Sequence, residues 1–377
     1  MATTTTRVLA VTIGSAAVAA LGALMAQDAD RVLAKGLTSV PGIKVGHHTL
    51  TERPTGCTVV LTEAGATAST DVRGPAPGTI QTDLLEPGTL VEQVHAIVLS
   101  GGSAFGLDTA SGVRRFLEER GIGFPTSVAK VPIVPGAIIF DLPVIGKPQI
   151  RPGADCGYRA AQAATSGPVQ EGSVGAGTGA TVGKITGYDR AMKGGIGTVA
   201  LRTQDGTIVA ALVVVNAVGS IVDPRDGRVV AGTRTPDGKG LADPRDLTRQ
   251  ATPFKANPLE NTTLGVVATD AALSKAQARL MAQSAHDGIA RAIYPAHTMG
   301  DGDTIFALAT ASRSGEVNLN ALNAIIALAA EATAQAIVRA VRAATGVPGY
   351  PAVRDLEGRG AEQQRLPRPA LQPRSGA

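Results

Sequence analysis

The stretch ENTTLGVVATDA, Glu260–Ala271, decides how this chain is interpreted. Its apolar part, Leu264–Ala268, predicts a buried strand, and a polar run of Asn-Thr-Thr beginning at Asn261 comes directly before it. Taken alone, that polar run is typical of a turn into a sheet edge. The functional interpretation is that the bond after Asn261 breaks itself and leaves Thr262 as a new N-terminal residue. Such a threonine has a hydroxyl nucleophile and its own base, because an α-amine has an unperturbed pKa of about 7.7–8.0.

A second polar motif lies in HTMGDGDTIFALAT, residues 297–310. In it Asp301 and Asp303 flank one glycine, ahead of a predicted strand at Thr304–Thr310. Alternate residues of an extended strand face the same side, so both carboxylates are expected to face one site. There they would orient the ammonium or the hydroxyl of Thr262. The alternative is a plain polar turn, because one Asp-Gly-Asp supplies too few ligands for calcium.

The glycine-rich stretch GSVGAGTGATVGK, Gly172–Lys184, does not have the spacing of a nucleotide site. A phosphate loop needs Gly six residues before its Lys and Ser or Thr after it, and these positions hold Thr178 and Ile185. A relaxed dinucleotide-binding spacing is met, but no strand-like run precedes it. Glycines in such a stretch allow close backbone packing. Lys184, which ends this tight apolar loop, is a candidate functional residue.

Histidine and cysteine spacing predicts no metal site. The histidines are His47, His48, His95, His286 and His297, and no pair has the i, i+4 spacing of a helical zinc site. We expect structural or surface roles for them. Cys57 and Cys156 lie far apart, and the sequence leaves open whether they are free thiols or one bridge. No metal and no cofactor are expected.

The rest of the chain alternates β-branched runs with alanine-rich ones. The predicted strands are Cys57–Thr62, His95–Leu99, Val131–Phe140, Gly197–Leu201 and Ile208–Asn216. Two long helices are predicted at Ser274–Ile293, which opens with a capping box, and at Leu319–Ala344, which is apolar enough to be buried on most sides. Ser103 is predicted to cap a helix that ends near Glu119, because its hydroxyl can accept a hydrogen bond from an N–H of the first turn. A catalytic role for this serine is not favoured, since the G-x-S-x-G motif of a serine hydrolase is absent. This mixture predicts a layered α/β or α+β domain.

Composition limits the classes of function. The 377 residues are 44% hydrophobic and 18% charged, with a net charge of +4, six Phe, four Tyr and no Trp. These values exclude collagen, a coiled coil and a disulfide scaffold, and they indicate a soluble globular protein. A nucleic-acid surface normally needs a basic stripe and stacking aromatic rings, so no nucleic-acid partner is expected.

Both ends of the chain differ in composition from the body. Residues 1–34 contain a charge-free stretch, Val8–Gln27, after a single Arg. This is typical of a secretory signal peptide, with Ala26 as the cleavage residue, or of a membrane anchor. A periplasmic or secreted protein would follow from either, whereas a buried N-terminal helix would leave the protein cytoplasmic. Residues 351–377 are rich in Arg, Pro, Gln and Gly and predict a disordered tail.

Several blocks in the same order resemble the L-aminopeptidase/D-esterase and β-aminopeptidase family, which includes the 6-aminohexanoate-oligomer (nylon oligomer) endohydrolases. The blocks are GIKVGHHT, RGPAPGT, SGGSAFGLD, VPIVPGAIIFDL, GSVGAGTGATVGK, VVVNAVG, NTTLGVVATDA and DGDTIFALAT, from about Gly42 to Val347. The resemblance implies a single α/β domain, a four-layer αββα sandwich of the N-terminal-nucleophile type. It also implies self-cleavage into a large chain, 35–261, and a small chain, 262–350, which stay associated.

Carried over residue by residue, the resemblance implies that Thr262 is the nucleophile and that Asn261 lies on the other side of the cut. Asn216, at the end of LVVVN, would donate to the tetrahedral oxyanion, which is worth roughly 3–4 kcal/mol for one donor. Lys184 would lower the pKa of nearby groups and stabilise developing negative charge. The implied catalytic residues are Thr262, Asn216, Lys184, Asp301 and Asp303.

The chain departs from the family pattern at two positions. The β-aminopeptidase branch has a serine nucleophile, so Thr262 favours the nylon-oligomer hydrolase branch. Some relatives have a tyrosine where this chain has Phe140. The resemblance implies hydrolysis of short linear amides or peptides with a free amine through an acyl-enzyme, by a homo-oligomer that is often a tetramer. Three alternatives stay open: an aminopeptidase acting on natural peptides, an acyltransferase that uses Thr262, and a binding protein in which Asn-Thr-Thr is a turn.

Overall fold

The structure is a computed structural model that describes residues 32–250 and 260–356. The strands of its main sheet are β1 (Lys44–Thr49), β2 (Gly56–Val72), β3 (Thr79–Ile80), β4 (Gln93–Ser100), β7 (Gly136–Ile138), β10 (Gly195–Arg202), β11 (Ile208–Asn216), β14 (Thr262–Thr269) and β16 (Thr304–Ala309). In the described part of the chain this sheet has nine strands, in the order β10-β11-β14-β16-β2-β4-β7-β3, with β1 paired to β2 beside this path.

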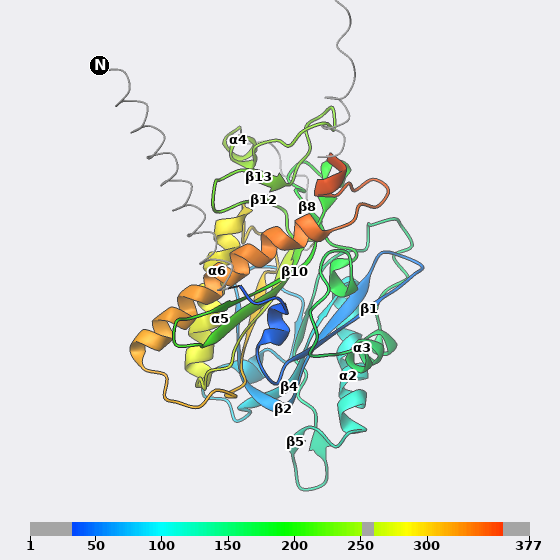
Figure 1. Cartoon of the computed structure of the whole chain (residues 1–377). Coiled ribbons are helices and arrows are strands. Elements are labelled where there is room, and N and C mark those ends of the chain that lie inside the picture. The colour runs from blue at the N-terminus through cyan, green and yellow to red at the C-terminus, as the bar shows by residue number, and fades with distance from the viewer. Residues whose placement is uncertain (1–31, 251–259, 357–377) are drawn as a thin grey trace, which may run out of the picture.

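Helices and smaller sheets complete the structure. The helices are α2 (Thr109–Glu118), α3 (Ala154–Gln162), α4 (Pro244–Arg249), α5 (Lys275–Ala292) and α6 (Leu319–Ala343). The smaller sheets contain β12 (Ser220–Val222), β13 (Val229–Ala231) and β15 (Ile293–Tyr294), then β5 (Phe124–Pro125) with β6 (Lys130–Val131), and β8 (Thr181–Val182) with β9 (Met192–Lys193). Figure 1 shows α5 and α6 on one side of the main sheet and α2 and α3 on the other.

Strand β2 joins two strand layers. Its register against β4 shifts between Leu61 and Ala66, so its first part pairs with β1 and β4 and its last part pairs with β16. Because side chains alternate along a strand, Val60 enters a central core together with Leu212 of β11 and Leu264 of β14. The two strand layers therefore pack face to face around one apolar core.

Helices cover the outer faces of both strand layers. Val59, on the opposite face of β2 from Val60, packs in a cluster with Val113 of α2. Val213 of β11 packs in another cluster with Ala285 of α5 and Ile337 of α6. The order of layers is helix, strand, strand, helix, so the predicted four-layer αββα sandwich is confirmed.

The two cysteines join strand and helix on one of these outer faces. Cys57 of β2 and Cys156 of α3 form a disulfide, and both lie in the apolar cluster under α2 and α3. The bridge therefore ties the start of β2 to a helix 99 residues further along the chain.

Both long predicted helices are confirmed. α5 begins after Ser274, whose side chain accepts a hydrogen bond from the Gln277 N–H while the Gln277 side chain accepts from the Ser274 N–H. α6 is long and apolar enough to cross a membrane by length and composition, but half of its most apolar stretch is buried in the protein. It packs tightly on β10, where a Cβ added to Gly197 would lie 2.2 Å from the Ala336 carbonyl oxygen. α6 is therefore a core helix of this fold.

Three predicted elements differ from the structure. The predicted strand Cys57–Thr62 is only the first part of β2, which continues to Val72. Ser103 does not cap a long helix, because its φ of 56° lies in the left-handed region and a 3₁₀ helix at Ser103–Asp108 precedes α2. The predicted strand Val131–Phe140 is interrupted and leaves only the short strands β6 and β7. The reason is that Pro132 and Pro135 have no N–H to donate to a neighbouring strand.

The predicted C-terminal tail also begins with packed residues. The Lys193 N–H donates to the carbonyl of Pro351 at 2.9 Å, and Ala352 and Val353 are buried. The prediction of disorder is therefore wrong for residues 351–356. The rest of the predicted tail, 357–377, and residues 1–31 of the predicted leader lie outside the described residues.

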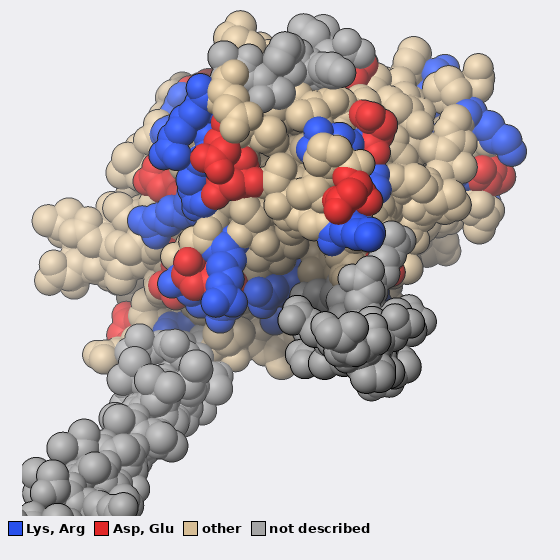
Figure 2. Space-filling model, turned by 90° about the horizontal axis from the view of Figure 1, so that it is seen from above, with Lys and Arg blue, Asp and Glu red and all other residues tan. Residues whose placement is uncertain are grey.

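Charges of both signs are mixed on the surface. Figure 2 shows acidic and basic side chains beside one another on the face seen from above, with uncharged surface between them. Several of the ion pairs join close neighbours in sequence, such as Arg225 with Asp223 at 2.7 Å and Arg245 with Asp243 at 3.1 Å. The mixture of signs leaves the face in Figure 2 without a strong field of one sign.

Candidate functional site

Three neighbouring strands bring most of the predicted site residues together. β14 begins at Thr262, and the antiparallel strand β11 ends opposite it, so that Asn216 pairs with Thr262. β16 runs parallel to β14 on its other side, and Asn261 forms a bridge with Asp301 just before the two strands begin. Residues distant in sequence therefore meet at one end of the central sheet.

The peptide between Asn261 and Thr262 is buried, with exposed fractions of 1% and 3% for the two residues. The Thr262 hydroxyl donates a hydrogen bond to the carbonyl oxygen of Asn261. The same oxygen accepts the Gly302 N–H at 2.9 Å. The side-chain amide of Asn261 is buried and has no hydrogen-bond partner among the described residues. A hydroxyl and an N–H donor thus both lie against the carbonyl that precedes the threonine.

Gly302 has no room for a side chain. A Cβ added to it would lie 2.4 Å from the Ala76 carbonyl oxygen and 2.9 Å from the Thr262 Oγ1. The loop after β2 presses on this turn, since the Ala76 N–H donates to the Asp301 carbonyl at 2.9 Å. The middle residue of the Asp-Gly-Asp motif is therefore constrained by close backbone approach.

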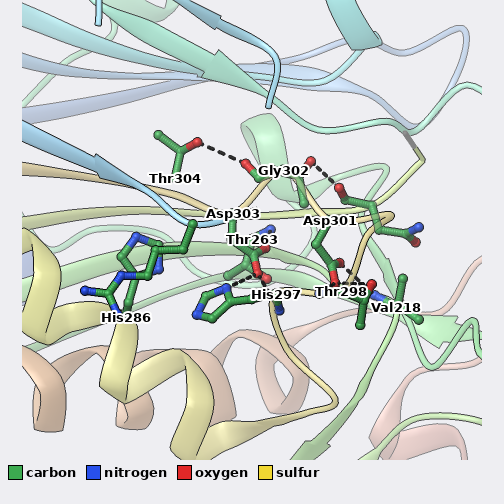
Figure 3. A network of polar contacts seen from close by, with 12 residues as sticks. Val218, Thr263, His286, His297, Thr298, Asp301, Gly302, Asp303 and Thr304 are labelled. Carbon is green, nitrogen blue, oxygen red and sulfur yellow. Dashed lines mark hydrogen bonds and ion pairs between the residues drawn. The ribbon is translucent and has the colours of Figure 1, made fainter. Parts of the chain in front are cut away.

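Asp303 holds the backbone next to Thr262. Its Oδ1 accepts the Thr263 N–H at 2.6 Å, and its Oδ2 accepts the His297 Nδ1 at 2.7 Å and the His297 N–H at 3.2 Å. Figure 3 shows Thr263 and His297 converging on this carboxylate. Asp303 therefore connects the start of β14 to the loop before β16.

Asp301 faces a different set of donors. Its Oδ2 accepts from the N–H and the hydroxyl of Thr298, at 2.9 and 2.7 Å, and its Oδ1 lies 3.5 Å from the Val218 N–H. Burial, together with the nearby Asp303 carboxylate, raises the pKa of Asp301 to about 6. Both carboxylates lie beside the start of β14, but they contact different partners (Figure 3).

Lys184 and Asn216 form one buried pair. The Lys184 ammonium donates to the backbone oxygen and to the Oδ1 of Asn216, both at 3.0 Å, and the Thr181 N–H donates to the same Oδ1 at 3.0 Å. Burial lowers the pKa of Lys184 to about 7, although the carboxylates of Asp301 and Glu260 oppose this effect. The contacts on Oδ1 leave the Nδ2 of Asn216 as the donor that faces the residues before Thr262.

The carbonyl of Glu260 lies within reach of two donors. The Asn216 Nδ2 donates to it at 3.4 Å and also to the Phe140 carbonyl at 3.1 Å, while the Tyr188 hydroxyl lies 3.4 Å from the Glu260 oxygen. Burial, reinforced by Glu260, raises the pKa of Tyr188, so its phenol stays protonated and can donate. Phe140 thus contributes its backbone here, and a phenol approaches this carbonyl from another segment.

Three residues of this site were missed from the sequence. His297 was expected to be structural or on the surface, yet it bonds Asp303, and its position at the start of the HTMGDGD motif was a usable signal. Gly302 was noted only as the residue between two carboxylates. Tyr188, four residues after Lys184, had no local signal. Among residues 32–250 and 260–356, no group of three or more His, Cys, Asp or Glu side chains is arranged to hold a metal ion.

The layered fold, in which a central strand begins at a buried threonine, is of the N-terminal-nucleophile hydrolase type. Within that class the chain belongs to peptidase family S58, whose model matches residues 35–354. The resemblance seen in the sequence is confirmed, and the protein is a hydrolase of peptide or amide bonds.

Relatives in this family are similar over most of the chain. An uncharacterized aminopeptidase of Mycobacterium tuberculosis is 46% identical over 289 residues, which is 73% of this chain and 81% of that protein. A 6-aminohexanoate-oligomer endohydrolase of Agromyces sp. is 34% identical over 273 residues, which is 72% of this chain and 73% of that protein.

Solved structures share the fold. A Burkholderia sp. β-aminopeptidase matches with a TM-score of 0.63 at 24% identity, over 90% of this chain and 96% of that one. The L-aminopeptidase D-Ala-esterase/amidase from Ochrobactrum anthropi, described as a variant of the Ntn hydrolase fold, matches with a TM-score of 0.65 at 21% identity, over 89% and 96%.

Proposed function

We propose that this protein is a self-processing N-terminal-threonine amide hydrolase, cut between Asn261 and Thr262. The two chains of its catalytic domain would be 35–261 and 262–350. The observation that carries the proposal is the contact of the Thr262 hydroxyl with the Asn261 carbonyl oxygen, which also accepts the Gly302 N–H. A nucleophile held against the carbonyl that it must attack avoids most of the entropy cost of bringing the two together.

In the proposed self-cleavage, the Thr262 Oγ1 attacks the carbonyl carbon of Asn261 and the C–N bond between the two residues breaks. The hydroxyl proton passes to the leaving nitrogen, which becomes the α-amine of Thr262. An ester then joins Oγ1 to Asn261, and water hydrolyses it to give the Asn261 carboxylate. The Gly302 N–H would stabilise the oxyanion, because it already donates to that oxygen at 2.9 Å.

In the cut protein, the α-amine of Thr262 would take the hydroxyl proton during attack on a substrate carbonyl. An unperturbed α-amine has a pKa of about 7.7–8.0, close to neutral pH. Substrate amine leaves, an acyl-enzyme ester remains on Oγ1, and water releases the acid. The Asn216 Nδ2 would donate to the substrate oxyanion. It already faces the residues just before Thr262, because it donates to the Glu260 carbonyl at 3.4 Å.

The charged residues would keep this arrangement in place. Asp303 holds the Thr263 N–H and would attract the new ammonium of Thr262. Lys184 holds both oxygens of Asn216, so it would fix the direction of the Nδ2 donor. Burial raises the pKa of Asp301 to about 6, so this carboxyl would gain or lose a proton near neutral pH.

We propose short linear amides or peptides with a free amine as substrates, including 6-aminohexanoate oligomers. Similarity at 34% identity to an endohydrolase of such oligomers supports this choice. Similarity at 46% identity to a protein named as an aminopeptidase supports a second candidate, an aminopeptidase acting on natural peptides. An acyltransferase using the same Thr262 differs only in passing the acyl group to an amine in place of water.

The test begins with intact-mass spectrometry of the purified protein after incubation near neutral pH. We expect two fragments, one starting at Thr262, for the wild type and for Thr262→Ser, which keeps a hydroxyl. Thr262→Ala should remain one chain. A wild-type chain that stays uncut, or a Thr262→Ala protein that hydrolyses amides at the wild-type rate, contradicts the proposal. Product analysis with 6-aminohexanoate oligomers, short peptides and a competing amine then separates the three activities.

A further inference from the structure

Asp303 is held mainly by one residue that is far from the nucleophile in sequence. Of the three hydrogen bonds that its carboxylate accepts from the described residues, two come from His297, through Nδ1 at 2.7 Å and through the backbone N–H at 3.2 Å. The third comes from the Thr263 N–H at 2.6 Å. A carboxylate acceptor requires the proton of His297 to lie on Nδ1. The direction of the Asp303 carboxylate is therefore set from the His297 side.

The backbone of His297 is constrained to deliver this contact. Its φ is 54°, in the left-handed region that residues other than glycine rarely adopt. Such conformations cost free energy and persist only where the surroundings impose them. At His297 the conformation directs both the N–H and the ring toward the same carboxylate oxygen of Asp303.

A second histidine supports the ring of His297. The His286 ring of α5 meets it edge to face, with centroids 5.0 Å apart, and its Nε2 donates to the Asp71 carbonyl at 3.0 Å. Burial lowers the pKa of His286 to about 4, so its ring is neutral near pH 7. The other charged groups nearby are Asp71, 3.6 Å from the His286 Nε2, and Arg73, paired to Asp71 at 2.7 Å.

We propose that His297 is a positioning residue for the reaction at Thr262. It orients the Asp303 carboxylate so that this group binds the Thr263 N–H, and so it fixes the backbone next to Thr262 (Figure 3). His286 limits the ring of His297 to one orientation through the edge-to-face contact. This inference rests on the proposed function of Thr262 and extends it to a residue outside the predicted set.

The inference is tested with two variants that tolerate a positive φ. His297→Asn keeps a side-chain N–H close to the place of Nδ1, whereas His297→Gly removes the side chain without adding backbone strain. Loss of a hydrogen bond to a charged group is worth roughly 10- to 100-fold. We expect His297→Gly to slow both self-cleavage and kcat by that factor with KM changed less than about threefold, and His297→Asn to restore both rates to within about fivefold of wild type.

Self-cleavage is followed by intact mass over time, and kcat and KM are measured on the cut fractions. Wild-type rates in His297→Gly would overturn the inference while leaving the role of Thr262 intact. Equal losses in the two variants, with unchanged thermal melts, would also overturn it, because the restored N–H would then be irrelevant. If His297→Gly does not fold, His297→Asp replaces it, since it matches Asn in shape and lacks the N–H. An uncut wild-type chain would refute the proposed function itself.

Discussion

Replacing Asn216 by Asp tests the donor role of its side-chain amide separately from the acceptor role. The Oδ1 of Asn216 accepts from Lys184 and from the Thr181 N–H, both at 3.0 Å, and a carboxylate oxygen keeps these contacts. The Nδ2 side is lost, and with it the donors to the carbonyls of Phe140 at 3.1 Å and Glu260 at 3.4 Å. Asn216→Asp therefore removes a donor while the shape of the side chain and its tether to Lys184 remain.

The magnitudes follow from these contacts. A buried acceptor left without its donor costs about 1–3 kcal/mol, and pairing of the new carboxylate with Lys184 offsets part of this, so we expect the unfolding free energy to fall by less than about 3 kcal/mol. Loss of one oxyanion donor costs about 100- to 1,000-fold in kcat. Self-cleavage should fall less than turnover, because the Asn261 carbonyl accepts from the Gly302 N–H and not from Asn216.

The assay measures kcat and KM for amine release from linear 6-aminohexanoate oligomers and short peptides, after intact mass has established the cut fraction. Thr181→Val is the matched control: it removes only the hydroxyl that lies 3.3 Å from the Asn216 Oδ1, so we expect a loss of less than about tenfold. A kcat for Asn216→Asp within about threefold of wild type would refute the oxyanion role.

Three further predictions concern the surroundings of the site. Gly302→Ala should slow self-cleavage by about 100-fold or more, followed by intact mass, because the added Cβ would press on the Thr262 Oγ1 at 2.9 Å; wild-type processing would contradict the close packing. His286 has a folded pKa of about 4 against 6.5 unfolded, so its share of stability, roughly 3 kcal/mol, is present above pH 6.5 and is lost as pH falls toward 4. In urea unfolding, the unfolding free energy of His286→Phe should fall less than that of the wild type between pH 6.5 and 4. An equal dependence of unfolding free energy on pH in the two proteins would count against the buried neutral ring. Cys156→Ala should lower the unfolding free energy by about 2–5 kcal/mol in urea, since it opens the loop to Cys57; equal stability with and without reductant in the wild type would argue against the disulfide.

Local patterns predicted both long helices and strand β11 well, but only the first part of β2. The strand Ile208–Asn216 has the predicted bounds, because an unbroken apolar run can be buried on both faces of a strand between two layers. The start of α5 was predicted from Ser274 and Gln277, whose reciprocal bonds are made within one turn. Elements that depend on distant partners, such as the segment Val131–Phe140, were predicted poorly.

The site was predicted in part for the same reason. Thr262 was identified by a local cue, a polar residue at the start of a buried strand, and so was the pair Asp301 and Asp303. His297 had no such cue beyond its nearness to that motif, because its partner oxygen is chosen by a backbone bend and by contact with His286 from α5.

The sequence by itself determined where both long helices and the strand Ile208–Asn216 lie, and it identified the residues with reactive side chains, because these properties depend on composition and short-range periodicity. The tertiary structure alone decided that Gly302 and Thr262 both donate hydrogen bonds to the Asn261 carbonyl. It also decided that a hydrogen bond from Lys184 orients the side chain of Asn216. It also decided that burial brings the pKa of that lysine to about 7. The physical reason is that such contacts join segments 32 to 41 residues apart, as between Lys184 and Asn216 or Asn261 and Gly302, so sheet register and burial determine them.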